Sequence, residues 1–235
     1  MADEADSMTV VSFAAGEAGY CAMLATDSGT TAVTTGPEGR SEFSSTEPPE
    51  PGRAKLAGGS GELELAWTPA GPLLEFSIGI PSVRAYAVAA TASGSGGSLA
   101  GPGVCWQLPA NGFSAMRTVW AATQKRGLVL LVAGRPEEAS AHGEELVGAA
   151  RLISDADPYG YGEPLLSTEY DGAGLHTRAT LELWPEFAEH VAERGGGVRV
   201  AGASLASDGH RLEAARFAWT LEGSPAVGGY EIVSR

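Results

Sequence analysis

Short stretches of alternating polar and apolar residues run through most of the chain. The clearest is Glu62–Trp67, where Glu62 and Glu64 alternate with Leu63, Leu65 and Trp67. Successive side chains of a strand point to opposite faces, so this pattern is typical of a half-buried strand. Comparable runs occur at Thr9–Ala14, Tyr20–Thr26, Leu73–Ile78, Arg84–Thr91, Ser114–Thr123, Leu128–Ala133, Leu165–Tyr170, Leu175–Leu183, Val198–Leu205 and Arg211–Thr220.

Turn-forming segments such as Asp27-Ser28-Gly29 and Ser207-Asp208-Gly209 separate these runs. Short strands at spacings of roughly 8–12 residues predict an all-β fold with two barrel-like or sandwich-like antiparallel halves. One short helix is predicted over 185–194, because Pro185 suits a first turn and three glycines follow Arg194. The segment Glu144–Ile153 fits a helix or a strand, and Gly148 favours the strand.

A Gly/Ser-rich segment near the middle, Ala92–Gly103, suggests where the halves divide. It is expected to be a flexible connection or a lid. The predicted organisation is a disordered acidic N-terminus over 1–7, a β half over 8–103 and a second β half over 104–235. Ala66-Trp67-Thr68 and Ala218-Trp219-Thr220 are alike, which either an internal duplication or chance explains.

Composition narrows the class of protein. The 235 residues hold 15 Lys and Arg against 29 Asp and Glu, a formal net charge of −14. Nucleic acid and anionic membrane surfaces would repel such a chain. The N-terminus is acidic, unlike a signal peptide, and the longest apolar stretch, Leu128–Ala133, is too short to span a bilayer. We therefore expect a cytoplasmic protein without a membrane span. In that compartment Cys21 and Cys105 are expected to be reduced thiols, and a disulfide between them is the less favoured alternative.

Sharp catalytic motifs are missing from the chain. It contains no phosphate-binding GxxxxGK[ST] loop, no HExxH or CxxC metal motif and no GxSxG nucleophile motif. The sequence therefore predicts neither a cofactor nor a metal site.

Candidate acid–base residues lie on the strand predicted within Leu175–Trp184. Alternation places His176, Glu182 and Trp184 on one face, together with Arg178 and Thr180. The more frequent arrangement makes that face solvent and the opposite face core. In the functional alternative the face lines a lumen, where a desolvated imidazole or carboxylate could act as acid or base.

A polar and aromatic loop provides further candidates. Asp157 is a possible catalytic acid and Tyr159 a possible binding residue, although the loop is equally typical of a turn-rich hairpin. Trp106, Trp120 and Tyr170 complete the candidate substrate-binding set with Trp184. Tryptophans on strands more often fill a core.

Three segments of the second half resemble a family of lipocalin-like proteins. These segments are Trp120–Pro136, Leu165–Gly174 and the closing Gly228-Gly229-Tyr230-Glu231. The family includes carotenoid 1,2-hydratase, tocopherol cyclase and the AttH type. The resemblance implies two barrel-like halves, a hydrophobic small-molecule substrate such as a polyene, prenylated ring or polyketide, and hydration, cyclisation or ring closure without a cofactor. This chain has no counterpart of the His-Ser-Trp-Gly-like junction of some relatives.

Three hypotheses follow. The first is a cofactor-independent cyclase or isomerase for a hydrophobic polyketide or terpenoid in natural-product biosynthesis, with its site between the halves and His176, Glu182 or Asp157 as acid or base. The second is a non-catalytic carrier of a hydrophobic ligand. The third is a β-sandwich interaction module without a pocket. A cavity of several hundred cubic ångströms would separate the first two from the third.

Overall fold

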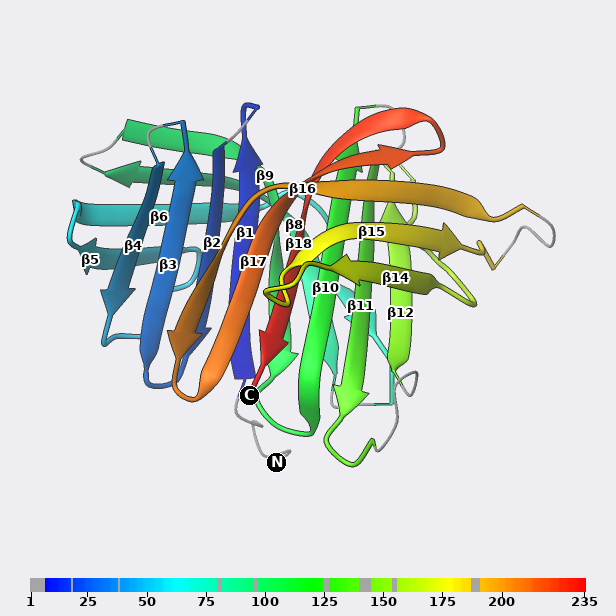
Figure 1. Cartoon of the computed structure of the whole chain (residues 1–235), viewed down its shortest axis with the longest axis horizontal. Helices are drawn as coiled ribbons and strands as arrows, with labels where there is room; N and C mark the ends of the chain where they lie inside the picture. Colours follow the sequence, from blue (N-terminus) through cyan, green and yellow to red (C-terminus); the bar gives the residue numbers. More distant parts are fainter. Residues whose placement is uncertain are drawn as a thin grey trace.

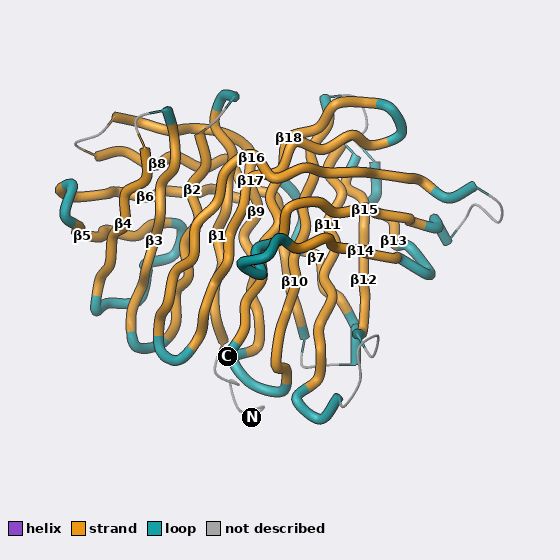
Figure 2. The backbone as a smooth tube through the Cα atoms, in the orientation of Figure 1, coloured by secondary structure: helices purple, strands orange, loops and turns teal. Residues whose placement is uncertain are grey.

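The computed structural model describes residues 7–17, 19–37, 39–79, 82–94, 97–124, 127–139, 145–153, 156–186 and 191–235. Every regular element in these residues is a β-strand, and all strand pairs are antiparallel (Figures 1 and 2). The predicted all-β fold with two antiparallel halves is confirmed. No helix in the described ranges has the length and apolar character needed to cross a membrane.

The first half is a closed barrel. Its strands are β1 (Ser7–Ala15), β2 (Gly19–Thr26), β3 (Gly29–Gly36), β4 (Gly39–Ser45), β5 (Arg53–Gly58), β6 (Gly61–Pro69), β7 (Leu74–Phe76), β8 (Val83–Gly94) and β9 (Gly97–Pro109). The sheet order is β6-β5-β4-β3-β2-β1-β9-β8-β7, and a further pairing of β6 with β8 closes the ring. Strand β7 pairs with the beginning of β8, outside the stretch that β6 occupies.

The second half is an open sheet that curls into a half-barrel. It contains β10 (Phe113–Thr123), β11 (Gly127–Pro136), β12 (Leu146–Leu152), β13 (Tyr159–Gly160), β14 (Leu165–Tyr170), β15 (His176–Leu183), β16 (Glu193–Ser207), β17 (His210–Leu221) and β18 (Ser224–Ser234). Their order is β13-β12-β11-β10-β18-β17-β16-β15-β14. In Figure 1, β14, β15 and the start of β16 cross β10–β12. The two ends of the sheet therefore lie opposite each other across its concave side.

The change from one sheet to the other falls between Pro109 and Phe113, a few residues beyond the expected division at 103/104. The Gly/Ser-rich segment expected as a loop instead belongs to the β8–β9 hairpin, which pairs from Arg84 with Gln107 to Gly94 with Gly97. The glycines at 94, 101 and 103 occupy strand positions where the neighbouring backbone is very close. A Cβ on Gly103, for example, would lie 2.2 Å from the Ser12 carbonyl oxygen.

The short helix predicted over 185–194 is absent from the described part of that range. Pro185 forms a bridge with Tyr161, and Glu193 and Arg194 already belong to β16. Residues 187–190 lie outside the described residues. The glycines at 195–197, which suggested a helix end, are strand residues of β16 paired with β15 and β17.

Three apolar cores account for the packing. One fills the barrel, around Phe13, Met23 and Trp67, and a second lines the concave side of the half-barrel, around Leu131, Phe217 and Trp219. The third lies between the halves and holds Trp106 of β9 and Trp120 of β10. The outer wall of the barrel and the convex face of the second sheet are thus both buried against each other.

A buried carboxyl group links the two halves. Glu231 on β18 has no exposed surface and accepts a hydrogen bond of 2.6 Å from the Tyr20 hydroxyl of the barrel. Thr118 donates to its other oxygen at 3.0 Å, and the Trp120 indole lies 3.3 Å from Oε1. Burial raises the pKa of Glu231 above its ordinary value.

Candidate functional site

The concave side of the half-barrel gathers the polar residues with the most unusual environments. A bulge in β15 decides which residues reach it: Glu169 pairs with Arg178, but Tyr170 pairs with His176, so Thr177 is an extra residue. The bulge reverses the alternation. His176 therefore lies on the buried side with Ala179 and Leu181, while Arg178 is exposed.

His176 is fully buried beneath an aromatic cluster. Its Nε2 lies 3.1 Å from the Tyr230 carbonyl oxygen, its ring centroid is 4.6 Å from that of Tyr230, and it stacks on Phe217 at 5.6 Å. Burial lowers the pKa of His176 to about 4, so the imidazole is neutral at pH 7. A neutral ring that donates from Nε2 to the carbonyl leaves Nδ1 as an acceptor, and Nδ1 has no hydrogen-bond partner among the described residues.

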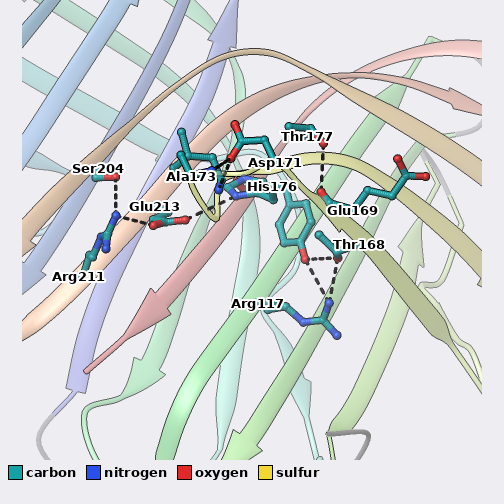
Figure 3. Close-up of polar contacts among 12 residues, drawn as sticks. Arg117, Thr168, Glu169, Asp171, Ala173, His176, Thr177, Ser204, Arg211 and Glu213 are labelled. Carbon is teal, nitrogen blue, oxygen red and sulfur yellow. Dashed lines mark hydrogen bonds and ion pairs between the residues drawn. The ribbon is translucent and has the colours of Figure 1, made fainter.

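Glu213 on β17 lies next to this imidazole. Its Oε2 is 3.9 Å from His176 Nδ1, too long for a hydrogen bond. The other carboxylate oxygen pairs with Arg211 at 2.6 Å, and Arg211 also reaches the Ser204 hydroxyl at 3.5 Å. Figure 3 shows this row from Ser204 through Arg211 and Glu213 to His176.

The Arg117 guanidinium and two hydroxyl groups, those of Thr168 and Tyr230, meet at the rim of the half-barrel. Thr168 Oγ1 on β14 lies 2.6 Å from the Tyr230 hydroxyl and 2.9 Å from Nη1 of Arg117 on β10. Arg117 Nη1 is also 3.2 Å from the Tyr230 hydroxyl (Figure 3 shows Arg117 beside Thr168). Burial raises the pKa of Tyr230 to about 12, partly offset by the Arg117 charge, so the phenol keeps its proton at neutral pH.

Ion pairs hold the rim together across the gap in the sheet. Arg117 pairs with Glu145, and both side chains are mostly covered. Arg151 of β12 pairs in the same way with Glu193 at the start of β16. Tyr161 donates to Glu193 at 2.7 Å, and Tyr159 lies 3.2 Å from the same carboxylate. The Glu193 contacts join β16 to β12 and to the β13 region, which are distant in the sheet order, whereas the Arg117–Glu145 pair spans the single strand β11.

Trp219 packs beside Phe217 in the core on the concave side of the half-barrel, with ring centroids 5.3 Å apart. The indole lies against Gly197 of β16, where a Cβ would come within 2.5 Å of the ring. Its buried Nε1 has no hydrogen-bond partner in the described part of the chain. A buried donor of this kind is uncommon in a folded protein and calls for a missing partner such as water or a ligand.

The structure separates most of the sequence-predicted site residues. Glu182 is half-buried and pairs with the exposed Arg194 at 3.4 Å, on the outer side of β15. Trp184 follows β15 and is half-buried, and its carbonyl accepts from the Gly162 amide. Tyr170 is 51% exposed at the end of β14. Of the predicted set, His176 lies within the polar cluster, while Tyr159 belongs to the neighbouring Glu193 cluster.

Asp157, Trp106 and Trp120 lie between the two halves, away from the concave side of the second sheet. Asp157 is exposed in a groove of about 690 Å³ between the halves, next to Leu128 and Leu152. Trp106 and Trp120 are completely buried in the core between the halves. Trp120 donates to Ser12 at 2.8 Å, and Trp106 lies 5.9 Å from Phe76, ring to ring.

Sequence reasoning missed Arg117, Thr168, Glu213 and Tyr230 as site residues. Thr168 and Tyr230 do lie in Leu165–Gly174 and Gly228–Glu231, two of the segments that carry the family resemblance, and that coincidence could have singled them out. Arg117 and Glu213 carry no such signal, because only the curl of the sheet brings their strands to the lumen.

The barrel contains a separate cavity of about 380 Å³ at the end where its β3–β4, β5–β6 and β8–β9 turns meet. This volume lies in the range of small-molecule pockets. The third hypothesis, a β-sandwich interaction module without a pocket, does not describe a molecule with this cavity. Cys21 and Cys105 are both buried and free of a disulfide.

Comparison of whole structures defines the class of fold as that of lipocalin-like proteins with two barrel-like halves, as the resemblance implied. Kievitone hydratase from Nectria haematococca superposes with a TM-score of 0.65 at 9% identity, covering 98% of this chain and 89% of that one. A putative AttH from Nitrosomonas europaea gives a TM-score of 0.65 at 10% identity, covering 100% and 94%. No protein-family model and no curated protein sequence matches the chain. At such identities the likeness concerns the fold.

Proposed function

We propose that the chain is a cofactor-independent enzyme of hydratase or cyclase type that acts on a hydrophobic small molecule at the rim of the half-barrel. The observation that carries the proposal is the cluster of three polar groups at this rim: Arg117 Nη1 donates to both the Thr168 and the Tyr230 oxygens, and these two hydroxyl groups lie 2.6 Å apart. A guanidinium and a phenol held side by side are two preorganised donors that can together stabilise negative charge developing on a carbonyl oxygen.

In the proposed complex, the Thr168 side chain turns away and a substrate carbonyl oxygen replaces its hydroxyl group beside Arg117 and Tyr230. The phenol of Tyr230 donates a hydrogen bond to it, and Arg117 supplies a second hydrogen bond and a positive charge. Polarising an enone in this way makes its distant alkene carbon electrophilic. Water or an internal nucleophile can then add to that carbon as the π bond of the alkene breaks, and the proton that the nucleophile loses ends on the carbon next to the carbonyl, which corresponds to hydration or ring closure.

The remaining residues of the cluster support this arrangement. His176 stays neutral beneath Tyr230 and contacts both its ring and its carbonyl, so we assign it as a positioning residue. The stacked Phe217 and Trp219 provide an apolar wall for a hydrocarbon chain. Holding a flexible chain in a reactive conformation contributes to the rate by removing its conformational freedom.

The test is turnover of a panel of hydrophobic enones that carry prenyl or polyene chains. Products are followed by liquid chromatography and mass spectrometry, in ordinary water and in D₂O, which marks new carbon–hydrogen bonds. We expect Tyr230→Phe to lower kcat by about 100-fold, the usual cost of losing one donor to an oxyanion. Tyr86→Phe is the matched control, since this half-buried tyrosine lies on β8 of the first barrel, and it should leave turnover unchanged.

Equal turnover in Tyr230→Phe and the wild type would contradict the role of the phenol. Tight binding of enones without any product, unchanged in Tyr230→Phe, would instead support the carrier hypothesis.

A further inference from the structure

The cavity at the end of the first barrel has two kinds of wall. Phe43 and Leu63 belong to the core inside the barrel, and Leu99 packs against that core. Hydroxyl groups also line the cavity. Thr34 and Ser41 are cross-strand partners on β3 and β4, and Ser98 is the second residue of β9. The cavity therefore continues the apolar barrel interior outward to a rim of hydroxyl groups.

Charge is missing from this lining. None of the described residues around the cavity has an ionisable side chain. A charged ligand entering the barrel would lose its hydration without gaining a partner of opposite charge, which is costly. The net charge of −14 adds a repulsion for anions. The cavity thus suits an uncharged molecule.

Glycines leave the mouth of the cavity open. Gly36 lines it, and a Cβ built on this residue meets no heavy atom within 4 Å. The φ of Gly36 is not in the positive region, so other residues fit its backbone. Gly59, in the neighbouring β5–β6 turn, has the same free space and an ordinary φ but does not line the cavity.

We infer that the first barrel is a second binding site, for a neutral and mostly apolar molecule that carries a hydroxyl or carbonyl group. The apolar part contacts Phe43, Leu63 and Leu99, and the polar group hydrogen-bonds to the rim hydroxyls of Thr34, Ser41 or Ser98. This site is in a different sheet from Tyr230 and Arg117 and does not depend on the proposed reaction.

Two dyes that differ by one sulfonate test the inference. N-phenyl-1-naphthylamine is neutral, and 1-anilinonaphthalene-8-sulfonate carries the same rings with a negative charge. Fluorescence titration of the whole chain should show one site at which the neutral dye binds at least tenfold more tightly than the sulfonate. Gly36→Phe, which places a ring in the mouth, should weaken binding of the neutral dye at least tenfold. Gly59→Phe should leave it unchanged.

Equal affinity for the two dyes, or unchanged binding in Gly36→Phe, would overturn the inference. Far-UV circular dichroism and thermal unfolding establish that each variant is folded. If Gly36→Phe does not fold, Ser41→Phe provides the same obstruction from a half-buried position on β4. Weakening by Tyr230→Phe but not by Gly36→Phe would place the dye in the half-barrel and exclude the barrel site.

Discussion

At the scale of single residues, Glu231 is the carboxyl group that the fold removes most completely from water. Tyr20, Thr118 and Trp120 donate hydrogen bonds to it, which favours the ionised form, but burial outweighs them and raises its pKa. The native state therefore binds the proton more tightly than the unfolded chain, whose pKa is near 4.5. The contribution of Glu231 to stability is present below this pH and is lost as the pH rises through the raised pKa.

Glu231→Gln reproduces the neutral form of this group, because the amide oxygen accepts from Tyr20 and the amide nitrogen donates to Thr118. We expect the variant to gain on the order of 1 kcal/mol in the free energy of unfolding at pH 8 and nothing at pH 4. Urea unfolding at pH 4, 6 and 8 measures this difference. Glu62→Gln, on an exposed position of β6, is the control. A loss of stability at pH 8 would contradict a raised pKa of Glu231 in the native state.

At the scale of elements, β16 shows how glycine makes room for a side chain of the half-barrel core. Gly195 and Gly197 pair with Leu221 and Trp219 of β17. A Cβ on either glycine would come within 2.5 Å of the partner's side chain. Gly196 points to the opposite face, and a Cβ there meets nothing within 4 Å. Glycine is thus required for packing at 197, where the rigid indole lies close, whereas at 195 the flexible end of Leu221 can move aside.

Gly197→Val should therefore displace Trp219 and cost about 1–3 kcal/mol, the range found for overpacked cores. Gly196→Val is the matched control and should change stability little, because valine suits a strand with free space beside it. Chemical denaturation with tryptophan fluorescence measures both variants. Equal costs at the two positions would mean that strand flexibility, and not contact with Trp219, is what glycine provides.

At the scale of the whole molecule, the two halves share a core. Trp106 and Phe76 of the first half and Trp120, Phe113 and Met116 of the second are buried in it. The Tyr20–Glu231 hydrogen bond crosses the same interface. A barrel alone would expose this apolar outer wall to water, so we expect neither half to be stable without the other.

Trp106→Ala should consequently destabilise both halves together. Removing a buried tryptophan costs about 3–5 kcal/mol, and hydrogen exchange followed by mass spectrometry should show protection falling in β1–β9 and β10–β18 alike. Trp184→Ala changes a half-buried position outside this core. It should lower protection from hydrogen exchange only in the residues around Trp184. Loss of protection in the first half alone, or two separate thermal transitions, would contradict a shared core.

The alternation rule succeeded for strands with one solvated face and failed where both faces are buried. In β6, Leu63, Leu65 and Trp67 face the barrel and the glutamates face solvent, as the pattern indicates. In β2 every residue is buried, so the pattern cannot tell which side faces the barrel and which the second half. The bulge at Thr177 had no sequence signal, and it turned His176 inward while Glu182 stayed on the outside.

The sequence by itself determined the all-β class with two antiparallel halves and most of the strands and turns, because backbone preferences and side-chain alternation act over a few neighbouring residues; it did not determine the β8–β9 hairpin or the strand that begins at Glu193. The tertiary structure alone decided the candidate site. Arg117, Thr168 and Tyr230 come from β10, β14 and β18, and the curl of the sheet brings them to one point. Burial of Glu231 likewise depends on the other half of the molecule. Contacts between distant strands follow from packing whole sheets, which no local pattern encodes.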